Sequence, residues 1–270
     1  MNDPWLVVGL GLVVGLGRWW YTLMMIAATG VAVVARRAVL RTRPDLRPTV
    51  DAERQLLIAA IGMAAAVVAA KGPFWMGWVA GSADASPPSL LLAGLPLSDG
   101  KTILWGLAGG YAGIEVAKRI VGQRVATGDA WVVPVAAAVG VGRWGCFGWG
   151  CCFGRPTDLP WAVGFSMLPD HGAVGRHPTQ LYESAFHLTF AAVAFLAIRR
   201  RRFADRWMMA YLIAYGVYRF VSEFWRTEPV WYRGCTFYQA SAVALTAVMT
   251  FLCAVRTVRR RRTMRPPVTS

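Results

Sequence analysis

Apolar positions fall into seven stretches along the chain, and each is close to the length that a membrane-spanning helix needs. A bilayer core takes ~20 mostly apolar residues in a helix, and shorter spans also occur. The fourth stretch is short and is expected to begin nearer Gly128. The pattern predicts an all-α, polytopic integral membrane protein with about seven transmembrane helices, over Trp19–Val34, Gln55–Ala70, Thr102–Val121, Trp131–Val141, Leu181–Ile198, Trp207–Phe220 and Thr236–Val255.

Basic residues gather after every second stretch. The clusters are Arg36, Arg37, Arg41, Arg43 and Arg47; Lys118, Arg119 and Arg124; Arg199 to Arg202 with Arg206; and Arg256, Arg259 to Arg262 and Arg265. Because loops rich in Lys and Arg stay cytoplasmic, this predicts an outer N-terminus and a cytoplasmic C-terminus. We expect a single transmembrane domain over residues 1–262, with an interfacial arm at 1–17, external segments at 71–101 and 142–180, and a disordered tail at 263–270.

Composition and charge limit the classes of ligand that the protein is expected to bind. The chain is 56% hydrophobic and carries a formal net charge of +15. In a soluble protein such a charge would suggest nucleic acid, but here the arginines flank apolar spans, so membrane lipids are the expected partners. The segment 100–110 resembles a phosphate-binding loop in its letters, but it lacks the preceding strand and the required spacing. We therefore expect neither nucleic acid nor nucleotide as a ligand.

The first candidate site surrounds Arg143, which lies in a glycine-rich segment that runs from Gly142 to Pro156. A charged side chain at membrane depth indicates a functional site. Arginine presents a planar set of donors that suits a phosphate. The alternative is an arginine that extends to the interface beside glycines used for helix packing.

A second polar pattern lies on the sixth apolar stretch. Tyr215, Arg219, Glu223 and Arg226 are spaced i, i+4, i+8 and i+11, so they share one face of a helix. Arg219 and Glu223 are expected to pair. Either this is a structural ion pair, or Arg219 is a second phosphate-binding arginine that Glu223 orients.

A third pattern begins with Arg176 and His177, followed by a proline that suits the first turn of a helix. Thr179, Glu183 and His187 then share one helical face. We expect the polar side chains of this segment to line the site, and these include Gln180, Tyr182 and Glu183. Tyr21 follows a basic and aromatic run that is typical of the membrane interface.

Five cysteines are an odd number, and three of them fall within seven residues, so no extracellular disulfide framework is expected. Cys146, Cys151 and Cys152 could form a nucleophilic, redox or metal site. Their spacing does not match a zinc signature, and a disulfide between neighbouring cysteines is strained. We expect small side chains that line a pocket, and no metal.

These blocks together resemble the prolipoprotein diacylglyceryl transferase family, from about Trp20 to Arg226. The matches are Trp20 to Met24, the block from Gly142 to Pro156, His177 to Glu183, and Tyr215 to Arg226. The resemblance implies a bacterial cytoplasmic (inner) membrane enzyme without cofactor or metal. Such enzymes transfer the diacylglyceryl group of phosphatidylglycerol to the thiol of a lipobox cysteine in a prolipoprotein signal peptide.

The resemblance also implies residue roles. Arg143 and Arg219 would neutralise the departing phosphate, and Glu223 would hold Arg219. The expected phosphatidylglycerol-binding residues also include Tyr21, Gly154, Tyr215 and Arg226, and His177 is the candidate base.

The sequence departs from the family pattern at three positions. Cys146 stands where the family usually has Asn, Cys151 where it has Glu, and Leu104 where it has a catalytic His. Leu104 cannot accept a proton. A transferase with another base or acceptor, a phospholipid-binding or lipid-moving protein without catalysis, and a membrane thiol redox protein therefore stay open as alternatives.

Overall fold

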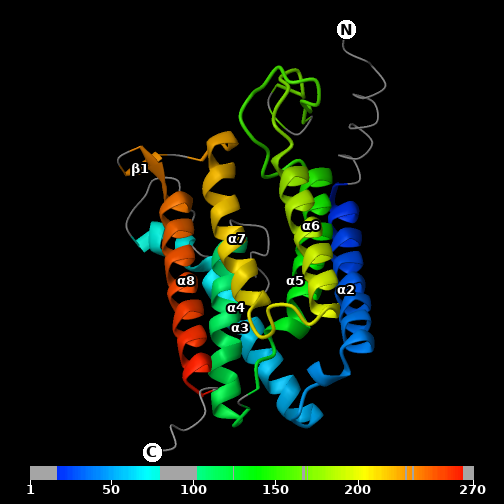
Figure 1. Ribbon diagram of the computed structural model, residues 1–270. Helices are drawn as coiled ribbons and strands as arrows, with labels where there is room; N and C mark the ends of the chain where they lie inside the picture. Colours follow the sequence, from blue (N-terminus) through cyan, green and yellow to red (C-terminus); the bar gives the residue numbers. More distant parts are fainter. Residues whose placement is uncertain are drawn as a thin grey trace, which may run out of the picture. The chain divides into compact units, whose positions relative to one another are not determined.

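The computed structural model describes residues 17–79, 102–123, 125–165, 168, 170–228, 230–232 and 234–263. Within these residues the protein is built from seven α-helices, so the all-α prediction is confirmed. Each predicted apolar stretch corresponds to one helix, to within one residue where a stretch begins or ends outside it. The helices are α2 (Gly17–Thr42), α3 (Ala52–Val79), α4 (Ile103–Ile120), α5 (Gly128–Trp149), α6 (Thr179–Arg199), α7 (Trp207–Ser222) and α8 (Phe237–Thr263) (Figure 1).

Short elements complete the described chain. A 3₁₀ turn η1 (Pro44–Leu46) follows α2, and η3 (Glu223–Trp225) directly continues α7. Two short strands, β1 (Val230–Tyr232) and β2 (Cys235–Thr236), form an antiparallel pair before α8.

Five of the helices are long and apolar enough to cross a membrane: α2, α3, α5, α6 and α8. The apolar sequence of α4 is interrupted near its C-terminal end by the charged residues Glu115, Lys118 and Arg119. Helix α7 has 16 residues, which makes it about 24 Å long. Large apolar side chains such as Ile26 and Leu56 are exposed, as expected where a helix faces lipid. The protein is a multi-pass membrane protein, while its orientation remains a prediction.

Two helices extend into segments that were expected to be external. Helix α5 continues to Trp149 because its glycines pack against α2 instead of forming a loop. A Cβ atom at Gly148 would collide with the indole ring of Trp20, so only glycine fits this helix contact. Gly150, with φ +72°, then ends the helix in the left-handed conformation. Helix α3 likewise runs to Val79, inside the predicted 71–101 segment. The predicted interfacial arm up to residue 16, the segment 80–101 and residues 264–270 lie outside the described residues.

The chain forms two compact units. One comprises the chain up to Arg47 and from Thr127 onward, and the other runs from Pro48 to Ala126. In the first unit, α5 packs against α2, α6 and α7, and α7 packs against α8 (Figure 1). In the second unit, α3 packs along α4, and Leu104 is buried.

A buried arginine fastens the end of α2 to the end of α6. Arg43 donates from Nη1 to the carbonyl oxygen of Ile198 over 2.8 Å. Its Nε and Nη2 donate to the carboxylate of Asp45 over 2.9 and 2.7 Å. These hydrogen bonds lower the pKa of Asp45 to about 2. Arg43, which the sequence marked as one of a basic cluster, therefore also has a structural role.

Candidate functional site

Three helices meet at the carboxylate of Glu183 on α6. Arg143 on α5 donates from Nη2 to Glu183 Oε2 over 2.5 Å. The Tyr215 hydroxyl on α7 donates to Glu183 Oε1 over 2.7 Å. His187 Nε2 lies 3.7 Å from the same oxygen, and His187 Nδ1 lies 2.9 Å from the Tyr211 hydroxyl. All of these side chains are buried. The predicted face of Thr179, Glu183 and His187 therefore points into the protein, as expected.

A second carboxylate, that of Glu223, pairs with Arg219 and Arg226. Arg219 Nη1 lies 2.9 Å from Glu223 Oε2, as the spacing predicted, although the angle does not suit a hydrogen bond. Thr236 donates its hydroxyl to Glu223 Oε1 over 3.0 Å, and Arg226 Nε lies 3.9 Å from Oε2. The Arg219 guanidinium also stands over the Tyr238 ring, 4.9 Å from its centre.

The two groups form one electrostatic unit, which we call the arginine cluster: Arg143, Arg219, Arg226, Glu183 and Glu223. Arg219 interacts electrostatically with Glu183, and both Glu183 and Arg143 interact with Arg226. Three guanidinium groups and two carboxylates leave one net positive charge in a buried place. Glu228, which is less buried, also contacts Arg226, 3.3 Å from its Nη2.

Two donors in the arginine cluster make no hydrogen bond among the described residues. These are Arg143 Nε and Arg226 Nε, both buried, of which Arg226 Nε lies 3.9 Å from Glu223 Oε2. Buried donors without hydrogen-bond partners are rare and costly in native proteins. Together with the net positive charge of the cluster, they fit a site for an anion that guanidinium groups recognise, such as a phosphate.

Backbone hydrogen bonds bring the three sequence blocks together around this cluster. The amide of Gly154 donates to the His177 carbonyl oxygen over 2.8 Å, and that of Arg155 donates to the Trp225 carbonyl oxygen over 2.7 Å. Arg155 also donates from Nε to the Arg226 carbonyl oxygen over 2.7 Å. A Cβ atom at Gly154 would collide with the Trp225 carbonyl oxygen, so this crossing requires glycine.

Of the other predicted site residues, Tyr21 interacts with the arginine cluster, whereas His177 makes its contacts elsewhere. Tyr21 interacts electrostatically with Arg143, and its ring packs edge-on against Trp149. His177 lies outside the Glu183 contacts: its Nδ1 is 3.3 Å from the Tyr182 hydroxyl, which accepts from Trp161 Nε1 over 2.7 Å. In one tautomer of the neutral imidazole, Nδ1 of His177 donates to this hydroxyl, and in the other it accepts from it.

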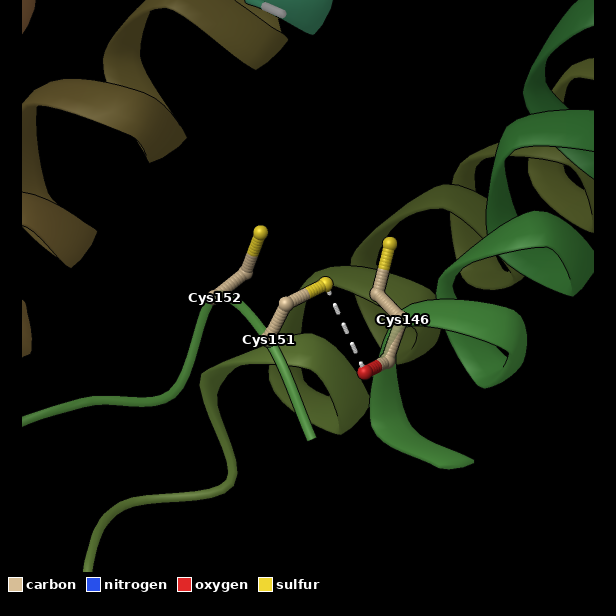
Figure 2. A group of neighbouring side chains, drawn as sticks. All are labelled: Cys146, Cys151 and Cys152. Atoms are coloured by element: carbon tan, nitrogen blue, oxygen red, sulfur yellow. Dashed lines mark hydrogen bonds between the residues drawn. The ribbon is translucent and has the colours of Figure 1, made fainter. Parts of the chain in front are cut away.

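The cysteines border the arginine cluster. Arg143 Nη1 lies 3.6 Å from Cys146 Sγ. Gln180 donates from Nε2 to the Cys151 carbonyl oxygen, and Thr179 donates its hydroxyl to that of Cys152, both over 2.6 Å. Figure 2 shows the Cys151 thiol pointing toward Cys146, to whose carbonyl oxygen it donates over 3.7 Å. The sulfur atoms of Cys146, Cys151 and Cys152 lie within 4.8 Å of one another.

Sequence reasoning placed Glu183 among pocket-lining residues and missed that it is the partner of Arg143. Spacing reveals partners on one helix, as it did for Arg219 and Glu223, whereas Arg143 and Glu183 are on different helices. Thr236 was also missed, because it lies in the short strand β2 and carries no charge. The one available signal was that Glu183 shares a helical face with two other polar residues.

Multiple apolar helices and a buried cluster of arginines and carboxylates define a multi-pass membrane protein with charged side chains in its interior. The comparison with known proteins is consistent with this class. A model of the prolipoprotein diacylglyceryl transferase family matches residues 12–256, and the chain belongs to this family.

Individual relatives agree with the family. The chain is 34% identical over 221 residues to a protein of Azoarcus sp., covering 77% of each, and 32% identical over 225 residues to one of Methylococcus capsulatus, covering 78% of each. A Clostridium tetani protein is 43% identical over 100 residues, which is 36% of this chain and 40% of that relative. All three are named phosphatidylglycerol–prolipoprotein diacylglyceryl transferase.

Proposed function

We propose that this protein transfers the diacylglyceryl group of phosphatidylglycerol to the thiol of a lipobox cysteine in a prolipoprotein signal peptide. The observation that carries the proposal is the arginine cluster, with its net positive charge and with two buried Nε donors, of Arg143 and Arg226, that make no hydrogen bond among the described residues. A lipid phosphate is an anion that three converging guanidinium groups suit.

The reaction needs stabilisation of a departing phosphate. The acceptor sulfur forms a bond to the terminal glyceryl carbon, the bond from that carbon to the phosphate oxygen breaks, and glycerol phosphate leaves. Arg143 and Arg219 would contact the phosphate as negative charge develops on its leaving oxygen. Glu223 holds Arg219 in place, and Arg226 adds a third positive charge.

Other residues would position the lipid. Tyr21 and Tyr215 would contact headgroup oxygens, and Gly154 keeps the loop close to the cluster. The acceptor thiol must lose a proton, and His177 is the candidate base in this scheme: when Nδ1 donates to the Tyr182 hydroxyl, Nε2 carries the free lone pair. From the arginine distribution and the bacterial relatives, we place the site on the outer side of a bacterial cytoplasmic membrane.

The test is a transfer assay with the purified full chain in phosphatidylglycerol vesicles and a lipobox peptide. Arg143→Ala and Arg219→Ala should each lower the rate about 10²- to 10³-fold, as loss of one charge-stabilising donor does. Arg54→Ala, which removes an exposed arginine, is the matched control. Unchanged transfer in both cluster variants would rule out the role of the arginines.

A second candidate is a phospholipid-binding protein without transfer activity, and Leu104 favours it because this residue replaces the family's usual histidine. Phosphatidylglycerol would then raise the unfolding temperature of the protein, while the peptide thiol would remain unmodified.

A further inference from the structure

Three thiols from two segments meet at the end of α5. Cys146 lies in the last turn of the helix, and Gly150 reverses the chain so that the next two cysteines return toward it. Among the described residues, Cys146, Cys151 and Cys152 are the group of His, Cys, Asp and Glu side chains whose ligand atoms gather closely enough to hold a metal ion, with all sulfur atoms within 4.8 Å of one another. Metal–sulfur bonds of about 2.3 Å place two ligand sulfurs about 4 Å apart. Small side-chain rotations would therefore bring the three into a coordination sphere.

The backbone holds these thiols in place. Cys152 has φ +62°, a left-handed conformation that favours glycine, and with this turn its sulfur atom lies within 4.8 Å of that of Cys151 (Figure 2). The carbonyl oxygens of both residues accept hydrogen bonds from Gln180 and Thr179 at the start of α6. An unfavourable backbone conformation that its neighbours maintain is a feature of functional sites.

The surrounding charge suits a metal bound by thiolates. Arg143 and Arg226 both interact electrostatically with Cys152, and Arg143 Nη1 lies 3.6 Å from Cys146 Sγ. Thiolates are soft ligands, and they favour a thiophilic ion such as Zn²⁺.

The geometry points to a Zn²⁺-type site formed by Cys146, Cys151 and Cys152, whose fourth coordination position is open to the thiol of the acceptor. Binding the ion releases three protons to water. The expectation of pocket-lining cysteines without metal came from their spacing, from the packing of free cysteine as a small apolar residue, and from the family resemblance. That expectation did not include the left-handed turn at Cys152.

The open position gives the site a role that rests on the proposed function. An acceptor thiol that binds the ion loses its proton to water and becomes a thiolate. Its sulfur then forms the bond to the glyceryl carbon, the electron pair of the broken carbon–oxygen bond leaves with the phosphate, and the ion keeps its oxidation state. Such a site would take the place of His177 in deprotonating the acceptor thiol, a step for which Leu104 offers no group.

Metal binding is tested on the full chain, purified in detergent under reducing conditions. Zn²⁺ content is measured by mass spectrometry of the elements, and Cd²⁺ titration is followed by thiolate-to-metal absorption. The cysteine variant carries Cys146→Ser, Cys151→Ser and Cys152→Ser. The matched control carries Cys235→Ser and Cys253→Ser, the other two cysteines of the chain. We expect about one ion in the wild type and the control, and loss of binding in the cysteine variant.

Equal Cd²⁺ binding in the wild type and the cysteine variant would overturn the site, as would a reduced, folded wild type that binds no ion. Cys146→Ser alone keeps the test decisive if the triple variant does not fold. It should weaken Cd²⁺ binding at least tenfold, as loss of one thiolate ligand requires, and unchanged affinity would overturn the assignment.

A transfer assay separates this site from the proposed function. Chelation of the ion should abolish transfer, and added Zn²⁺ should restore it. Full transfer by the metal-free protein would overturn the role of the ion and leave the transferase proposal standing. A protein that binds the ion through these cysteines but forms no thioether would support the metal site and contradict the transferase proposal.

Discussion

Replacing Glu183 with Gln separates an anion site from a purely structural ion pair. The substitution keeps the size of the side chain and an oxygen that accepts from Tyr215, but it removes the charge opposite Arg143. The net charge of the arginine cluster would rise from +1 to +2. If the cluster binds a lipid phosphate, Glu183→Gln should lower the thermal stability of the lipid-free protein and increase the stabilisation that the lipid provides.

The magnitudes follow from the burial of the pair. Removing one partner of a buried ion pair costs about 3–5 kcal/mol, and we expect about 3 kcal/mol because the hydrogen bond from Tyr215 is retained. For a protein of this size, that corresponds to a decrease of about 6–12 °C in unfolding temperature. One additional positive charge that tightens lipid binding tenfold would add about 1.4 kcal/mol to the stabilisation by saturating lipid, or about 3–6 °C.

The assay is thermal unfolding in detergent, without lipid, with phosphatidylglycerol, and with diacylglycerol, which lacks the phosphate. Phosphatidylglycerol should raise the unfolding temperature of Glu183→Gln more than that of the wild type, and diacylglycerol should affect both equally. An equal response of the two proteins to phosphatidylglycerol would refute the reasoning, and so would a variant whose lipid-free stability equals that of the wild type.

Three further predictions concern stability. Asp45→Asn should lower the free energy of unfolding at pH 6, as measured by denaturant unfolding. Because the pKa of Asp45 is lowered to about 2 in the folded protein from ~3.9 when unfolded, the difference in stability between the variant and the wild type should shrink as the pH falls from ~4 to ~2. A difference that stays constant over this pH range would contradict the prediction. Thr236→Val should cost about 1–3 kcal/mol in the same assay, since it removes the hydroxyl that donates to buried Glu223, whereas an unaltered stability would show that this bond contributes nothing. Gly148→Ala should lower the free energy of unfolding by about 1–3 kcal/mol, because its Cβ would collide with Trp20. Its control, Gly30→Ala, has open space for a Cβ and should leave the stability unchanged. Equal thermal stability of the two variants would argue against the α2–α5 contact.

The helices could be predicted because apolar stretches of membrane length leave few alternatives to a helix. The pairing of Arg219 with Glu223 could be predicted because both lie on one helix, four residues apart. The pairing of Arg143 with Glu183 could not, because contacts between helices depend on how the helices pack. Local spacing contains no information about that packing.

Glycine was the residue type whose meaning depended most on context. The segment after Gly142 was predicted to be external, with helix packing as the alternative role of its glycines; Gly145 and Gly148 lie inside α5 and allow α2 to approach, which agrees with that alternative. The proximity of the three thiols was also hidden, because it depends on the left-handed conformations of Gly150 and Cys152. Cysteine rarely adopts such a conformation, so no residue preference pointed to it.

The central claim is that guanidinium groups from separate helices bind one lipid phosphate. The most direct measurement is an experimentally determined structure of the full chain in a phosphatidylglycerol bilayer. The account predicts a phosphate whose oxygens lie about 3 Å from Arg143 Nε and from a guanidinium nitrogen of Arg219, within ordinary hydrogen-bond distance. A lipid phosphate bound elsewhere, with both arginines contacting only Glu183 and Glu223, would contradict it.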